Sequence, residues 1–193
     1  MADGDKSKIL VSKIRTDLGD EAHKLIRTDL MIYRKLSSYQ MDWSKRFKCI
    51  KEVIQFDLVK DQETYPLETK VVSINSLSYN FSYSNRPIIT EITKHDTRQI
   101  QMSGSDLFEA GNVMYADAYV QATEDDAITR TNDPIIGEDY HELLVKAVLS
   151  EFIYLRKDFM PLPEVEKRVK ETSYAALAIN RAVLRDANFG PIF

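Results

Sequence analysis

The sequence has 193 residues but only one cysteine, Cys49, and it lacks any long apolar run. A single cysteine cannot form a disulfide within the chain, and it excludes a zinc site built from several thiolates. No apolar stretch approaches the roughly 20 residues that a membrane-spanning helix needs. The first residues are charged where a secretory signal peptide would be apolar. We therefore expect a protein made in the cytosol, with no membrane contact.

Motifs of the common nucleotide-binding and hydrolytic enzymes are also missing. The sequence contains no P-loop, no glycine-rich dinucleotide turn and no Gly-x-Ser-x-Gly elbow. Basic residues are outnumbered, since 26 Lys and Arg face 30 Asp and Glu, which gives a net charge of −4. This balance argues against bulk binding of nucleic acid, which normally needs a basic surface. We expect a protein that is not an enzyme and holds no cofactor or metal.

What the sequence does contain is a hydrophobic period that changes twice along the chain. Residues 1–45 and 139–187 carry apolar residues at helical spacing, whereas residues 46–138 alternate apolar with polar residues, as strands with one buried face do. We predict an α+β fold, in which the two helical segments form a four-helix bundle and the middle segment forms an inserted small antiparallel β lobe. Residues 188–193 contain a Gly-Pro pair that cannot continue a helix, so we expect an extended C-terminal tail there.

Capping residues and the spacing of apolar residues indicate where the helices lie. Asp5 is a suitable N-cap and Gly19 a suitable residue after the end, which predicts a first helix between them. The next apolar stripe predicts a second helix from Asp20 to about Ser37. Residues 143–155 are apolar around most of a helical circumference, which is typical of a helix at the centre of a bundle.

Strands are predicted in the middle segment by alternation. Ile54, Phe56 and Leu58 alternate with polar residues, and residues 113–120 form a further candidate strand. Turn-forming residues separate these runs, as expected for a small antiparallel sheet or sandwich.

Three aromatic residues, Tyr79, Phe81 and Tyr83, also alternate with polar ones and would share one face of a strand. Such a stripe could stack against a sugar or a base, as in a small-ligand or glycan-binding module. A strand that buries one face gives the same pattern. We favour a core position or a contact between subunits.

The densest cluster of titratable side chains surrounds His141 and includes Glu138, Asp139 and Glu142. A general acid–base pair or a metal site could be imagined there. However, His141 and Glu142 are adjacent in a predicted helix and point about 100° apart, so they do not converge. Acidic residues in the first turn are also favoured by the helix dipole. We therefore interpret the cluster as a helix start, with an enzyme around His141 as the less favoured alternative.

Cys49 and the basic residues near it allow two interpretations each. Lys48 could lower the pKa of the Cys49 thiol, but a nucleophile also needs a base positioned by the fold, so we favour a packed or half-exposed thiol.

The first 50 residues are rich in basic side chains, among them Lys8, Arg15 and Arg34. Acidic residues are interspersed with them, which favours the solvated faces of two helices over a nucleic-acid patch.

Three large apolar side chains follow the last predicted helix, those of Phe189, Ile192 and Phe193. Their burial would contribute about 4–9 kcal/mol, at about 1.5–3 kcal/mol each, before the cost of ordering the segment. Folding back onto the chain's own helices would bury them. Docking into a groove on a partner would bury them as well, and we favour this second arrangement.

Four short stretches, taken with their order and spacing, carry a family resemblance. They are residues 14–21 (IRTDLGDE), 63–67 (ETYPL), 139–144 (DYHELL) and 163–166 (PEVE). In this layout the sequence resembles the head–tail adaptor proteins of tailed bacteriophages, including the tail tubular protein A type of short-tailed phages. Those proteins share a helical N-terminal pair, a β insertion, and two C-terminal helices followed by a tail. The Ser/Asn/Tyr-rich stretch 73–85 departs from the family pattern.

The resemblance implies a structural protein of the virion that is made in the host cytoplasm and assembled at the head–tail junction. A dodecameric ring of it would lie below the portal, extend the DNA channel, and give the tail its attachment platform. The family's C-terminal segment reaches toward the portal, which here implies docking by Phe189, Gly190, Pro191, Ile192 and Phe193. The β lobe would meet a tail nozzle or another tail component, with Tyr79, Phe81 and Tyr83 as candidates for that tail-side contact or for a contact between subunits. Twelve copies of −4 give −48, so double-stranded DNA would pass during genome ejection without being bound.

Overall fold

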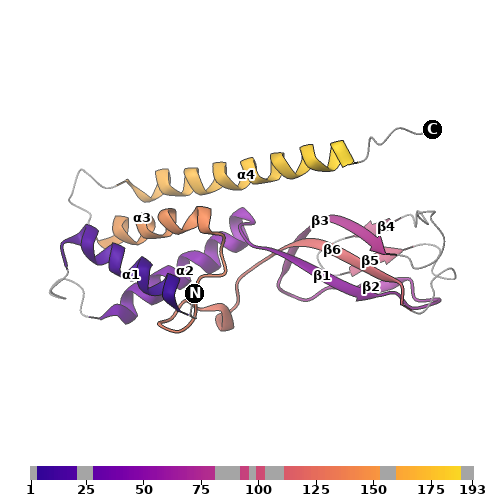
Figure 1. Ribbon diagram of the computed structural model, residues 1–193, viewed down its shortest axis with the longest axis horizontal. Helices are drawn as coiled ribbons and strands as arrows, with labels where there is room; N and C mark the ends of the chain where they lie inside the picture. The colour runs from indigo at the N-terminus through magenta and orange to yellow at the C-terminus, as the bar shows by residue number, and fades with distance from the viewer. Residues whose placement is uncertain are drawn as a thin grey trace. The chain divides into compact units, whose positions relative to one another are not determined.

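The computed structural model describes residues 4–20, 28–80, 92–95, 99–102, 111–152 and 160–187. They form a mixture of helices and small antiparallel sheets, which confirms the predicted α+β class (Figure 1). The chain divides into two compact units. Unit 1 comprises Met1–Cys49 and Ala122–Phe193, and unit 2 comprises Ile50–Gln121. The boundaries predicted from the sequence are 45/46 and 138/139.

Unit 1 is helical, and α3 is its most deeply buried element. Its helices are α1 (Asp5–Leu18), α2 (Asp29–Phe47), α3 (His141–Phe152) and α4 (Leu162–Ala187), with short 3-10 turns at Glu124–Asp126 and Glu138–Tyr140. α3 packs against α1, α2 and α4, and Leu144, Ala147 and Val148 are completely buried. The prediction that the apolar run forms a buried helix is confirmed for residues 143–152, and residues 153–155 lie outside the described part of the chain. Among the described residues, none of the helices is both long and apolar enough to span a membrane.

α2 does not end at Ser37, where the sequence predicts its end, but continues to Phe47. The Ser37 hydroxyl donates to the carbonyl of Tyr33 at 2.8 Å, so this serine bonds within the helix instead of breaking it. The apolar stripe also continues beyond it, through Tyr39 to the fully buried Trp43. The helix begins at Asp29 rather than Asp20, and residues 21–27 lie outside the described part of the chain.

The start of α1 depends on a glycine. The N-cap is Gly4, with φ 82°, and not the predicted Asp5, which lies in the first turn. A Cβ atom at Gly4 would lie 2.3 Å from the carbonyl oxygen of Arg130. Position 4 therefore requires glycine for two reasons, the left-handed backbone and the close approach of the loop that contains Arg130. At the other end, Gly19 caps α1 with φ 68°, as predicted.

Unit 2 contains two three-stranded antiparallel sheets, with strand orders β1-β6-β3 and β2-β5-β4. The strands are β1 (Lys51–Asp57), β2 (Thr64–Pro66), β3 (Val71–Asn80), β4 (Ile92–His95), β5 (Gln99–Met102) and β6 (Val113–Val120). Burial alternates along β1 and β6, as the sequence predicts. One apolar cluster takes residues from both sheets; it contains Leu58, Tyr65, Ile100, Met114 and Ala116.

Candidate functional site: an apolar groove beside α2

Two buried polar side chains of α2 hold the segment 126–136 against the helix. Ser37 Oγ accepts a hydrogen bond from the backbone N–H of Ile128 at 2.8 Å. Gln40 Nε2 donates to the carbonyl of Asp126 at 2.8 Å, and Gln40 Oε1 accepts from the N–H groups of Ile135 and Ile136 at 3.0 and 3.2 Å. These bonds satisfy backbone groups of an irregular segment that would otherwise be buried without partners.

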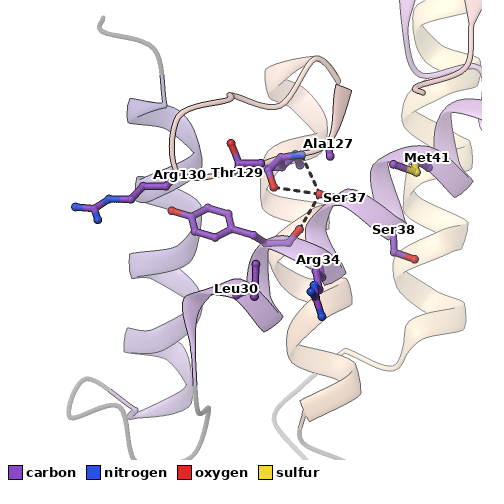
Figure 2. Close-up of a pocket in the computed structure, with 10 residues that line it drawn as sticks. Leu30, Arg34, Ser37, Ser38, Met41, Ala127, Thr129 and Arg130 are labelled. Carbon is purple, nitrogen blue, oxygen red and sulfur yellow. Dashed lines mark hydrogen bonds between the residues drawn. The ribbon is translucent and has the colours of Figure 1, made fainter. Parts of the chain in front are cut away.

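An apolar groove lies between this anchored segment and the exposed side of α2 (Figure 2). We call it the α2 groove, and its volume is about 550 Å³. Its lining residues come from two parts of the chain: Leu30, Tyr33, Arg34, Ser37, Ser38 and Met41 from α2, and Ala127, Ile128, Thr129 and Arg130 from the loop. The volume falls within the range of about 300–1,000 Å³ that is typical of ligand pockets.

The groove combines an exposed apolar surface with two arginines. Leu30 is 53% exposed although its side chain is apolar, and Met41 is half-buried. Arg34 and Arg130 are exposed, and neither forms an ion pair with a described residue. Figure 2 shows the side chains of Arg34 and Arg130 pointing in different directions. This arrangement suits a partner that offers large apolar side chains together with a carboxylate.

A second cleft of about 570 Å³ adjoins the α2 groove and shares Tyr33 and Arg130 with it. Lys8, Arg15 and Asp29 also line this cleft. Arg15 is buried there, which corrects its predicted place on a solvated helix face. The charge of Arg15 is already compensated by the carboxylates of Asp20 and Asp29, so this side chain offers little free positive charge to an anion in the cleft.

The cluster around His141 does not converge on one point. Nε2 of His141 lies 3.1 Å from the carbonyl oxygen of Ile136. Glu138 accepts from Lys6 at 2.6 Å, which lowers the pKa of that carboxyl group, and Glu142 pairs with Lys146 at 2.7 Å. Burial lowers the pKa of His141. Within the described residues, no group of three or more His, Cys, Asp or Glu side chains could hold a metal ion.

Cys49 is buried, as the favoured interpretation of the sequence holds. Its Sγ atom lies 3.5 Å from Ser173 Oγ, which in turn lies 3.0 Å from the hydroxyl oxygen of Tyr140. Burial raises the pKa of the Cys49 thiol to about 11, and it raises the pKa of Tyr140 to about 12. Both groups are therefore neutral at physiological pH. The pKa of the Cys49 thiol is raised by burial and is not lowered by the neighbouring Lys48.

The residues predicted for docking fall largely outside the described part of the chain. This holds for Phe189, Gly190, Pro191, Ile192 and Phe193, and for Phe81 and Tyr83. Tyr79 lies near the end of β3, where its backbone pairs with Met114 of β6.

The α2 groove itself is not predicted from the sequence. A signal was present, because Ser37, Gln40 and Ser44 recur at helical spacing within an apolar stripe, and all three are buried. Ser44 also bonds the returning chain, since its Oγ accepts from the N–H of Ala122 at 2.8 Å. Buried polar residues at that spacing indicate that an irregular segment packs along the helix.

Comparison with known proteins gives no assignment. No protein-family model matches the chain, and no curated protein is significantly similar to it in sequence.

Proposed function

We propose that the chain is a structural head-to-tail adaptor of a phage virion, which forms a ring under the portal, extends the DNA channel and provides the platform for tail attachment. The observation that carries this proposal is the arrangement of the chain. Helices from both ends of the sequence lie in unit 1, and the β strands between them form unit 2. This is the order of elements that the resemblance implies, and the four helices would form the bundle from which the ring is built.

The surface chemistry supports an assembly role better than a reaction. His141, Glu138 and Glu142 each have a separate partner, whereas the α2 groove presents an apolar surface that favours contact with another protein. In the proposed junction the segment 189–193 docks on the portal and unit 2 meets the tail component. The proposal involves no cofactor, and the net charge of −4 per copy keeps contact with passing DNA weak.

The test is assembly on the portal protein encoded by the same genome. We expect electron micrographs of portal rings mixed with the chain to show an added ring of density on one face of the portal, with the same rotational symmetry. A His141→Ala variant should assemble equally well, because no reaction is involved. Portal rings that carry no added density at saturating concentrations of the chain would rule the proposal out.

A further inference from the structure

The α2 groove and the segment 189–193 have matching chemistry. The groove is lined by Leu30, Met41 and Ile128 and is flanked by two arginines without a described ion partner. The segment carries the apolar side chains of Phe189, Ile192 and Phe193, and the eight residues from Asp186 onward contain one charged side chain, the Asp186 carboxylate. Apolar side chains next to a carboxylate are what such a groove would accept.

The segment cannot reach the groove of its own copy. Glu166 of α4 pairs with Arg46 near the end of α2, and Ser173 lies beside Cys49, so α4 runs in the same direction as α2 (Figure 1). Ala187 lies about 31 Å beyond Glu166 at about 1.5 Å per residue. The middle of the groove, at Ser37, lies about 13 Å in the opposite direction from Arg46.

The six residues that follow Ala187 span at most about 20 Å, which is less than half of the separation of more than about 40 Å. We propose that the α2 groove of one copy binds the segment 189–193 of a second copy when no portal holds that segment. Phe189, Ile192 and Phe193 occupy the apolar lining, and Asp186 approaches Arg34 or Arg130.

The contact is heterologous, because a groove on one copy meets a different surface on the next. Repeated heterologous contacts close into rings or continue as filaments, depending on the rotation between neighbours. The inference rests on the proposed function in one respect only, namely that the portal would bind the same segment during assembly. It can therefore be tested without any portal.

The first test measures binding of a fluorescein-labelled peptide, residues 186–193 with blocked ends, to the full-length chain by fluorescence anisotropy. Leu30→Glu should weaken binding at least tenfold, because it places a charge in the apolar lining. Ile9→Glu is the matched control, since Ile9 lies on α1 outside the groove and is 56% exposed, close to the 53% of Leu30. Equal affinity of the two variants for the peptide would overturn the inference.

The peptide itself supplies two further comparisons. Replacing Phe189 and Phe193 with alanine should weaken binding at least tenfold, and Asp186→Lys should weaken it several-fold. A peptide with the Asp186→Lys substitution that binds as tightly as the original would show that the arginines take no part and would contradict the proposed chemistry.

The second test is sedimentation velocity of the free chain. The full-length chain should associate as its concentration rises, and chains that end at Asn188 or carry Leu30→Glu should remain monomeric. Association of the shortened chain to the same extent would refute the contact. Failure of portal assembly, in contrast, would remove the proposed function and leave this contact standing.

Discussion

Nη1 of Arg15 lies 2.9 Å from the Oδ2 atom of Asp20, in an ion pair whose side chains are 7% and 0% exposed. The same guanidinium also pairs with Asp29 at the start of α2, where Arg15 Nε lies 2.7 Å from Asp29 Oδ1. The end of α1 is thereby tied to the start of α2 through one buried cation. Removing Arg15 would leave the Asp20 carboxylate uncompensated away from water, whereas the Asp29 side chain is 49% exposed.

We predict that Arg15→Leu lowers the free energy of unfolding by about 3–5 kcal/mol, the range for breaking a buried pair. Urea unfolding followed by the fluorescence of Trp43, the chain's one tryptophan, measures this in unit 1, because Trp43 is fully buried there. Arg46→Leu is the control. Arg46 also pairs with two carboxylates, but it is 45% exposed, so its loss should cost about 1 kcal/mol or less. Equal effects of the two substitutions would contradict the buried-pair explanation.

Ser37 and Ser38 offer a second matched pair. Ser37→Ala removes the acceptor for the N–H of Ile128, which then remains buried without a partner, so we expect a loss of about 1–3 kcal/mol. Ser38 is exposed on the adjacent position of α2, and Ser38→Ala should change stability by about 0.5 kcal/mol or less. Thermal unfolding of the two variants measures the difference. A Ser37→Ala chain as stable as the Ser38→Ala chain would show that the anchoring bond contributes nothing.

The fold class follows from the sequence because periodicity reports burial directly. The apolar circumference of residues 143–155 predicts a buried helix, which the structure shows as α3, and the alternation of residues 113–120 predicts β6. Both signals depend only on which side chains face the core.

Predictions fail where a residue's role is set by partners distant in sequence. Arg15 is classed with the solvated basic residues, since nothing local reveals that Asp20 and Asp29 enclose it. Ser37 is taken for a helix end, since serine is unfavourable in helix interiors, and the segment that it bonds lies 91 residues away. The α2 groove depends on that same long-range contact and is therefore invisible to local patterns.

Gly4 should not tolerate a side chain. We predict that Gly4→Ala destabilises unit 1 by about 1–3 kcal/mol, because the new Cβ would lie 2.3 Å from the Arg130 carbonyl and the backbone has a φ of 82°. Gly19→Ala separates the two causes, since Gly19 has a similar φ of 68° but no atom within 4 Å of its Cβ position. We expect Gly19→Ala to lower the free energy of unfolding by only about 1 kcal/mol. The same size of loss at both glycines would mean that the approach of Arg130 does not matter.

The thiol of Cys49 makes stability fall at alkaline pH. Its pKa in the folded protein is about 11, against a reference value of 9.0, because burial disfavours the thiolate. Below pH 9 the thiol is protonated in both states and has no effect. Between pH 9 and 11 the unfolded chain loses this proton and the folded chain keeps it, so the free energy of unfolding falls by about 1.4 kcal/mol per pH unit.

Tyr140, whose pKa rises from 10.0 to about 12, adds a similar decline at slightly higher pH, so the two contributions must be separated. The measurement is urea unfolding at pH 8 and at pH 10.5 of the natural chain and of Cys49→Ala. We expect the natural chain to lose about 2 kcal/mol more than the variant over this interval, because only its unfolded state gains a thiolate. Parallel pH profiles would show that the thiol is not buried in the folded chain. Rapid reaction of Cys49 with a disulfide reagent at pH 8 would show the same, since a protonated thiol enclosed by Trp43, Tyr140 and Ser173 reacts only when unit 1 opens.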